Sequence, residues 1–312
     1  MKFGFLSGCL DGMTLQEKMA YASKVGFDAL DVSCWPKNNT RDYSGSDIDT
    51  EHLTTEQAQQ IQDWEKQYNV TITSLAYYDN MLVNDQQLRK EYYDHLKSVI
   101  VAAGMLHVPL VGCFIGKNQD ESLVDNFKEF QPLFKDLLAF AREHNVKLMI
   151  ENCPMPGWQE DGLPGTISYS PELWDEMFKL VPDDNFGLNF DPSHLKWLGI
   201  DYLKALRDYK DRIFHIDAKD IKMHPEMFNR YGIFGKKLNR TDPEDLGFWT
   251  PVIPGLGDIN WCEFYEVMKE IGYDGCFSIE HEDRRFAGNN ELVEKGLEFS
   301  YNYLHPIITD FQ

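Results

Sequence analysis

The chain has 312 residues, of which 43% are hydrophobic and 26% are charged, a balance typical of globular domains. Its formal net charge of −21 would repel phosphate backbones and anionic membranes, which argues against nucleic acid or a membrane surface as a partner. We find no apolar run close to the roughly 18 residues that a membrane helix needs. The length suits one large α/β domain.

The six cysteines are scattered and form no C-x-x-C pair, and several lie inside apolar runs where cysteine acts as a small hydrophobic residue. This usage predicts a reduced, cytoplasmic setting. The segment LSGC, residues 6–9, resembles a lipoprotein cleavage box. The five residues before it are too few for the charged and apolar regions of a signal peptide, so we interpret it as the end of a first strand.

Short apolar segments alternate with amphipathic segments along the whole chain. The predicted strands cover residues 2–8, 29–35, 71–78, 110–116, 147–153, 186–191, 213–220 and 276–282. The predicted helices cover residues 14–26, 54–69, 85–104, 123–145, 170–181, 192–199, 201–209, 260–272 and 291–304. This alternation indicates a parallel sheet, and eight repeats predict a single (β/α)8 TIM barrel over residues 1–312. An open, doubly wound sheet is the alternative, although the chain has no phosphate-loop or dinucleotide glycine signature.

A long insertion, residues 221–257, separates the seventh strand from its helix. It exceeds an ordinary connection, and it follows the carboxyl end of a strand, where barrel active sites form. Its aromatic residues predict a lid over a ligand, whereas the alternative is a surface excursion that packs on itself. These aromatic residues are Phe228, Tyr231, Phe234, Phe248 and Trp249.

Four titratable residues lie at or near the ends of four consecutive predicted strands: Glu151, Asp191, His215 and Glu280. The carboxyl ends of barrel strands surround one site, so we expect these side chains to meet. Three crowded carboxylates repel one another unless a cation lies between them. Three oxygen donors and an imidazole suit Mn²⁺, Mg²⁺, Co²⁺ or Fe²⁺ better than a thiolate zinc site. Taken singly, each residue also fits a helix cap, a solvated charge or a hydrogen-bonded core histidine.

Further polar and aromatic residues follow these strand ends. His194 lies three residues after Asp191 and either contacts a substrate or caps a helix. Lys219 either holds a substrate oxygen or pairs with a nearby acid, and Trp35 either walls a sugar or packs in the core. Because side chains alternate along a strand, His281 should point to the helix layer and Glu282 to the barrel interior.

Several segments together resemble the xylose-isomerase-like barrel superfamily, in particular its sugar phosphate isomerase/epimerase branch. They are MIENCP (149–154), FDPSHL (190–195), IFHIDAKD (213–220) and IPGLGDINW…GYDGCFSIEHED (253–283). The likeness is specific over residues 147–283, and before that it depends on the rhythm of strands and helices.

The resemblance to members of the D-tagatose 3-epimerase type implies one divalent metal ion held by Glu151, Asp191, His215 and Glu280. It implies Mn²⁺ as the first expectation, with Zn²⁺ also among the metals to test. It further implies that Glu151 and Glu280 move protons and that His194 contacts the substrate. The expected substrate is therefore a small carbohydrate.

Two features depart from the epimerase pattern. Those enzymes place a substrate-contacting arginine six residues after the ligand histidine, and this chain has Ile221 there. The long insertion is similar instead to members that act on 3-keto glycosides, by epimerisation or by eliminating the aglycone.

The residues and the resemblance agree on proton abstraction next to the carbonyl of a keto-sugar, through a cis-enediolate at the metal. Isomerisation or epimerisation is the first hypothesis for the reaction, and elimination from a 3-keto glycoside is the alternative. A non-catalytic sugar-binding barrel is a third class. A phosphodiesterase resembling endonuclease IV is disfavoured by the net charge of −21 and by nine histidines that mostly lie away from the strand ends. A homo-oligomer is also an open expectation, with Phe286, Tyr301 and Tyr303 as candidate contacts.

Overall fold

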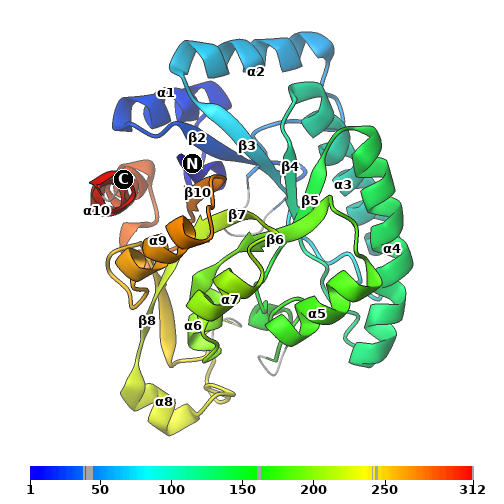
Figure 1. Ribbon diagram of the computed structural model, residues 1–312, viewed down its shortest axis with the longest axis vertical. Coiled ribbons are helices and arrows are strands. Elements are labelled where there is room, and N and C mark those ends of the chain that lie inside the picture. The colour runs from blue at the N-terminus through cyan, green and yellow to red at the C-terminus, as the bar shows by residue number, and fades with distance from the viewer. Residues whose placement is uncertain (38, 40–44, 160–162, 241, 243–244, 311–312) are drawn as a thin grey trace.

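Eight parallel strands close into a barrel in the computed structural model, which describes residues 1–37, 39, 45–159, 163–240, 242 and 245–310 (Figure 1). Around the barrel the strands are β1 (Lys2–Leu6), β10 (Cys276–Ile279), β7 (Ile213–Ala218), β6 (Phe186–Phe190), β5 (Lys147–Glu151), β4 (Leu110–Cys113), β3 (Thr71–Ala76) and β2 (Ala29–Ser33). The predicted (β/α)8 TIM barrel is confirmed.

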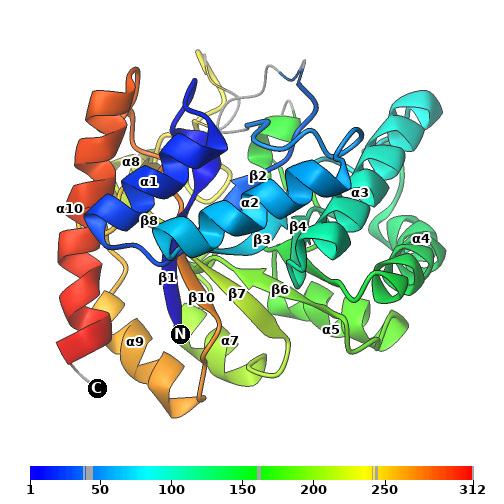
Figure 2. The ribbon, with the colours of Figure 1, turned by 90° about the horizontal axis from the view of Figure 1, so that it is seen from above.

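The helices lie outside the strands and cover the barrel (Figure 2). They are α1 (Leu15–Val25), α2 (Thr55–Tyr68), α3 (Gln86–Leu106), α4 (Leu123–Glu143), α5 (Pro171–Leu180), α6 (Pro192–Trp197), α7 (Tyr202–Asp208), α9 (Trp261–Glu270) and α10 (Asn290–Asp310). Short 3-10 turns add η1 (Ser7–Cys9), η2 (Pro156–Trp158) and η3 (Arg284–Phe286). None of the helices in the described part of the chain could span a membrane.

Local sequence signals set the helix boundaries. Thr14 caps α1 in a capping box with Glu17, since each side chain bonds the backbone of the other residue. Thr54 and Gln57 form the same box at the start of α2. Gly26 ends α1 with a φ of 112°, a left-handed conformation that glycine adopts without strain.

The apolar core lies mainly between the barrel and the helices, whereas part of the barrel interior is polar. His215 on β7 is in register with Asn189 on β6 and with Cys276 on β10. Asp217 follows His215 by two residues, so both side chains face the interior, with Asp217 nearer the carboxyl end. Polar side chains therefore line the interior as far as the mouth of the barrel, which is the end at which the strands have their carboxyl ends.

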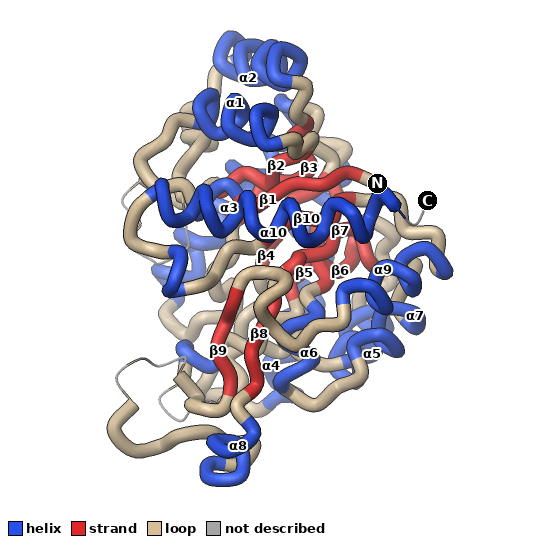
Figure 3. The backbone as a smooth tube through the Cα atoms, turned by 90° about the vertical axis from the view of Figure 1, so that its left-hand side faces the viewer, coloured by secondary structure: helices blue, strands red, loops and turns tan. Residues whose placement is uncertain are grey.

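The insertion forms an antiparallel hairpin of β8 (Asp220–Met223) and β9 (Trp249–Val252), with α8 (Pro225–Tyr231) between them (Figure 3). It has a small apolar core of its own against α6, where the rings of Trp197 and Trp249 stack with centroids 5.3 Å apart. Phe248 is fully buried there, whereas Phe234 is 61% exposed. Phe248 and Trp249 thus pack on the fold, and a lid formed by the rest of the insertion stays a prediction.

One buried carboxylate anchors both ends of the insertion. Asp220 Oδ1 accepts hydrogen bonds from the backbone N–H groups of Ile221 and Ile259, at 2.9 and 3.0 Å. Asp220 Oδ2 accepts from the N–H of Gly255 at 3.2 Å and from Trp261 Nε1 at 2.9 Å. The hairpin therefore leaves and rejoins the barrel at one fixed point.

The aromatic residues near the carboxyl terminus differ in their surroundings. Tyr301 packs against the rings of Phe3 and Phe27, with centroids 5.5 and 4.8 Å away. Tyr303 is 38% exposed. Tyr301 is thus a packing residue of the monomer, and the homo-oligomer stays a prediction.

Candidate active site

Carboxylates from four neighbouring strands gather at the mouth of the barrel. Glu151 is the last residue of β5, Asp191 directly follows β6, Asp217 lies near the end of β7, and Glu280 directly follows β10. Carboxylate oxygens of Glu151, Asp217 and Glu280 lie within 4.8 Å of one another. The carboxyl ends of these strands thus converge as a parallel barrel requires.

His215 lies below this group. Its Nε2 atom is 3.0 Å from Asp31 Oδ2, and one ligand atom of each of these two residues lies within 4.8 Å of Cys276 Sγ. Each strand residue advances roughly 3.3 Å, so the two-residue offset places the backbone of His215 roughly 7 Å deeper in the barrel than that of Asp217. The His215 ring still reaches Asp217, with Nδ1 3.5 Å from Asp217 Oδ1. The structure therefore brings Asp217, in place of His215, together with Glu151 and Glu280.

His194 joins the first two carboxylates. Its Nε2 atom lies 3.1 Å from Glu151 Oε1 and 3.1 Å from Asp191 Oδ2. Burial by itself lowers the pKa of His194, but the effects of Cys153 and Asp191 outweigh it and raise this pKa well above its usual value. Asp191 also caps α6, because its Oδ1 accepts from the N–H of Ser193 at 2.7 Å. Asp191 thus holds the helix that presents His194.

Lys219 approaches the mouth from β7. Its Nζ atom lies 3.4 Å from Glu280 Oε1 and 2.7 Å from Glu282 Oε2. As the alternation predicts, Glu282 faces the site, while His281 faces α10. A Cβ atom placed on Gly296 in α10 would lie only 2.4 Å from His281 Nε2. The close approach of strand and helix there depends on that glycine.

The charges at the mouth fit a bound cation. Burial and the charges of Glu280 and Glu151 raise the pKa of Asp217 well above its usual value. Burial also raises the pKa of Glu280, although Lys219 opposes that shift. Glu280 Oε2 is buried and makes no hydrogen bond, and Asp191 Oδ2 is buried 3.1 Å from His194 Nε2. A divalent cation would relieve the repulsion and could bind these oxygens, and oxygen donors are those that Mn²⁺ and Mg²⁺ prefer.

Trp35 lies beside the site, separated from it by one ring. Its indole packs against Tyr77 and Tyr78, with ring centroids 5.9 and 6.0 Å away. The Tyr78 hydroxyl accepts a hydrogen bond of 2.9 Å from Asn189 Nδ2. A contact between Trp35 and a sugar stays a prediction.

Sequence reasoning missed four polar residues around this site: Asp31, Cys153, Asn189 and Asp217. Cys153 Sγ lies within 4.8 Å of ligand atoms of Glu151 and His194. The alternation of side chains was the signal for Asp217, since it shares a face with His215. It could not show which of the two reaches the mouth.

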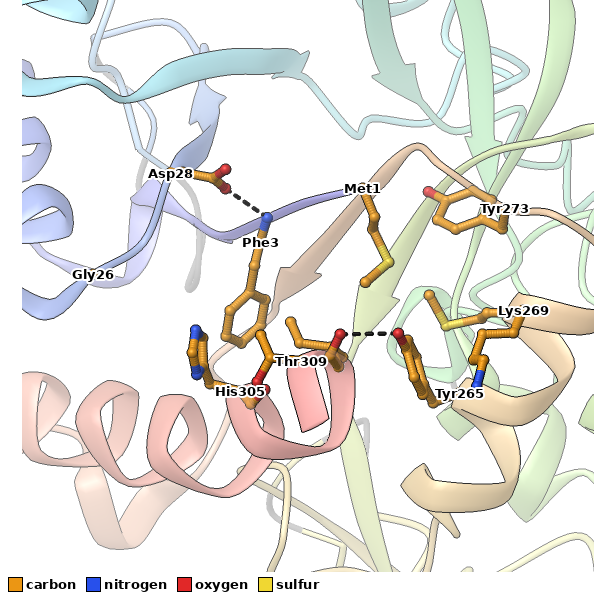
Figure 4. Close-up of a pocket in the computed structure, with 11 residues that line it drawn as sticks. Met1, Phe3, Gly26, Asp28, Tyr265, Lys269, Tyr273, His305 and Thr309 are labelled. Carbon is orange, nitrogen blue, oxygen red and sulfur yellow. Dashed lines mark hydrogen bonds between the residues drawn. The ribbon is translucent and has the colours of Figure 1, made fainter. Parts of the chain in front are cut away.

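A cavity of about 260 Å³ lies at the opposite end of the barrel (Figure 4). It is formed by the start of β1, the approach to β10, and helices α9 and α10, with Met1, Phe3, Asp28, Tyr265, Tyr273 and His305 among its lining residues. Hydrogen bonds from the N–H of Phe3 to Asp28 Oδ1, at 2.8 Å, and from the Tyr265 hydroxyl to the Ile308 carbonyl, at 2.9 Å, hold its walls. This end of a TIM barrel serves stability, so the cavity contributes nothing to the candidate site.

A family model described as xylose isomerase-like TIM barrel matches residues 19–303. The chain belongs to this family. The Bacillus subtilis protein YfiH is 27% identical over 305 residues, covering 91% of this chain and 93% of that protein. An inosose dehydratase of Clostridium perfringens is 27% identical over 190 residues, covering 58% of this chain and 57% of that enzyme.

Solved structures share the fold with this chain at low sequence identity. A D-psicose 3-epimerase crystallised in the presence of D-fructose superposes with a TM-score of 0.72 at 12% identity, covering 99% of each chain. The IolI protein with a bound zinc atom superposes with a TM-score of 0.71 at 17% identity, covering 100% of this chain and 99% of that one. These likenesses establish the fold, and several family relatives carry enzyme names.

Proposed function

We propose that the chain is a metal-dependent sugar isomerase or epimerase that removes a proton next to the carbonyl of a keto-sugar. The observation that carries this proposal is the convergence of Glu151, Asp217 and Glu280 within 4.8 Å at the mouth. The name of the D-psicose 3-epimerase in the same fold supports a carbohydrate substrate.

Four carboxylates would hold the cation in this proposal: Glu151, Asp191, Asp217 and Glu280. Asp217 takes the place that the sequence assigned to His215, because His215 lies against Asp31. With oxygen ligands only, we propose Mn²⁺ as the metal, with Mg²⁺ next. The bound cation would supply Lewis-acid polarisation of the substrate carbonyl.

The proton transfers fall to Glu151 and Glu280. They come from β5 and β10, and β6 and β7 lie between those strands in the barrel. A sugar held at the mouth would therefore meet the two carboxylates from different sides. One glutamate would take the proton, and the other would return a proton to the opposite face or the neighbouring carbon.

His194 and Lys219 complete the proposed site as cationic donors. His194 Nε2 holds the orientation of the Glu151 carboxylate at 3.1 Å, and Lys219 Nζ lies 3.4 Å from Glu280 Oε1. Both groups would also donate hydrogen bonds to substrate oxygens. Their positive charge would stabilise the negative charge that develops when the proton leaves.

Elimination is the second candidate. The sequence match to an inosose dehydratase favours it, because that name describes loss of water from a keto-polyol. The same abstraction by a glutamate would begin the reaction, and the ammonium of Lys219 would protonate the departing oxygen. The leaving group would be water or the oxygen of a glycoside.

Deuterium exchange tests the proposal directly. The protein, loaded with Mn²⁺ or stripped with EDTA, is incubated in D₂O with free ketoses, ketose phosphates, 3-keto glucosides and inososes, and NMR follows the products. We expect exchange only in the loaded protein, and its loss in Glu151→Gln and Glu280→Gln. An epimer or isomer identifies the first candidate, and an unsaturated product or free aglycone identifies elimination. Wild-type exchange in both variants would refute the roles of the glutamates.

A further inference from the structure

A chain of buried contacts rises through the barrel interior to Asp217. His215 Nδ1 lies 2.7 Å from Asn189 Oδ1. Asn189 Nδ2 donates to Asp217 Oδ2 at 2.6 Å and to the Tyr78 hydroxyl at 2.9 Å. We propose that Asn189 is a positioning residue for Asp217 and that His215 fixes the orientation of the Asn189 amide. The inference rests on the proposed role of Asp217 as a metal ligand.

The hydrogen-bond chemistry sets the direction of this chain. The Asn189 amide presents its nitrogen to Asp217 Oδ2 at 2.6 Å, and a carboxylate ionised by a bound cation could only accept from it. The amide oxygen of Asn189 then faces His215, whose Nδ1 atom must carry a hydrogen and donate it. If the amide turned over, its oxygen would face a carboxylate oxygen, and two acceptors would oppose each other in a buried space.

His215 is itself held from the other side of the barrel. Its Nε2 atom lies 3.0 Å from Asp31 Oδ2. Asp31 Oδ1 accepts hydrogen bonds from the hydroxyls of Thr73 at 2.7 Å and Ser74 at 2.8 Å. The imidazole is only 1% exposed, so it cannot exchange these partners for water. Strands β2 and β3 thereby fix a ring on β7, which in turn fixes an amide on β6.

Residues that orient metal ligands affect metal affinity without touching the metal. Loss of such a partner costs about 10- to 100-fold in affinity. Asn189→Leu removes the donor to Asp217 at similar size, so we expect Mn²⁺ to bind about 10- to 100-fold more weakly. Asn185→Leu is the matched control: Asn185 is also buried, precedes β6 at the far end of the barrel, and bonds the Leu138 carbonyl at 3.0 Å. Its Mn²⁺ affinity should equal that of the wild type.

A pair of substitutions at His215 separates the two sides of the ring. In His215→Asn, the amide nitrogen takes the place of Nδ1 and retains the donor to Asn189. In His215→Gln, the amide nitrogen of the longer side chain takes the place of Nε2. This variant keeps the contact with Asp31 and loses the donor to Asn189. We expect calorimetric titration to show Mn²⁺ affinity close to wild type in His215→Asn and about 10-fold weaker in His215→Gln.

NMR of protein labelled with ¹⁵N-asparagine gives a second readout in the absence of metal. The side-chain amide protons of Asn189 should resist exchange in the wild type and in His215→Asn, and exchange faster in His215→Gln. If the wild type binds no Mn²⁺ but shows this pattern, the proposed function fails while the orientation by His215 stands. Unprotected wild-type protons, or equal protection in His215→Gln, would overturn the inference, as would unchanged Mn²⁺ affinity in Asn189→Leu.

Discussion

Lys219 and Glu280 form a largely buried ion pair at the mouth of the barrel, with Nζ 3.4 Å from Oε1 and side-chain exposures of 6% and 13%. The Lys219 ammonium group therefore contacts one of the carboxylates that would bind a cation. Removal of the ammonium group should raise the metal affinity and lower the rate of deuterium exchange.

Lys219→Met should separate catalysis from metal binding. Without the ammonium, Mn²⁺ meets less positive charge, so its affinity should rise. Deuterium exchange into the substrate should fall by about 100-fold or more, because a charged donor is lost. Lys222→Met is the control, since Lys222 is half exposed and pairs with Asp258. Unchanged exchange in Lys219→Met would remove this residue from the mechanism.

The pH dependence of stability should report the crowded carboxylates. The pKa of Glu280 is raised in the fold, mainly by burial, so the folded protein binds a proton more strongly than the unfolded chain. This stabilisation is complete below the unfolded pKa of about 4.5 and is lost as the pH rises through the folded value. In EDTA, the contribution of Glu280 to the urea midpoint should therefore decline from acid towards neutral pH.

Glu280→Gln removes this titration. The difference between the urea midpoints of Glu280→Gln and wild type should widen as the pH rises, in favour of the variant. Saturating Mn²⁺ should reverse the order at neutral pH, because the wild type gains more binding energy. Parallel curves for the two proteins in EDTA would contradict the assignment of the raised pKa to Glu280.

Asp217→His should change the metal preference. The proposed ligands of the wild type are oxygen atoms only, and an imidazole raises affinity for borderline metals such as Zn²⁺. Competition dialysis against equal Mn²⁺ and Zn²⁺ should show a higher bound ratio of zinc to manganese in the variant. Asp274→His, an exposed position outside the site, should leave the ratio unchanged. An unchanged ratio in Asp217→His would exclude Asp217 from the ligands.

Asp220→Asn should destabilise the fold by about 3 kcal/mol. One acceptor oxygen becomes a donor, and it then faces buried N–H groups such as those of Gly255 or Ile259. Urea unfolding followed by tryptophan fluorescence measures the loss. Asp274→Asn should stay within about 0.5 kcal/mol of wild type, because that side chain is exposed. A similar value for Asp220→Asn would show that the anchor is dispensable.

The sequence predicted the strands and most of the mouth because these depend on local patterns. Apolar runs gave the barrel strands, and the polar residues Glu151, Asp191 and Glu280 end them. The position of a side chain along the barrel axis does not follow from such a pattern. His215 and Asp217 share a face, and only the closure of the barrel decides which one reaches the other carboxylates. The sequence alone could not decide between them.

The structure of the insertion could not be predicted from the sequence either. Its strands β8 and β9 pair although they are far apart in the sequence. The stack of Trp197 on Trp249 likewise joins residues that are 52 positions apart. Neither contact leaves a periodic signal in a short window. A local reading could therefore locate the insertion without showing that it forms a hairpin against α6.

The anchor at Asp220 has a consequence for how such a protein can diversify. Lys219 in the mouth and Asp220 at the base of the hairpin are adjacent residues, and the returning chain is fastened to the same carboxylate through Gly255, Ile259 and Trp261. The tip of the hairpin can therefore lengthen, shorten or change its side chains while the lysine keeps its place. If the proposed function holds, changes in the hairpin could therefore alter substrate choice without moving the residues proposed for proton transfer.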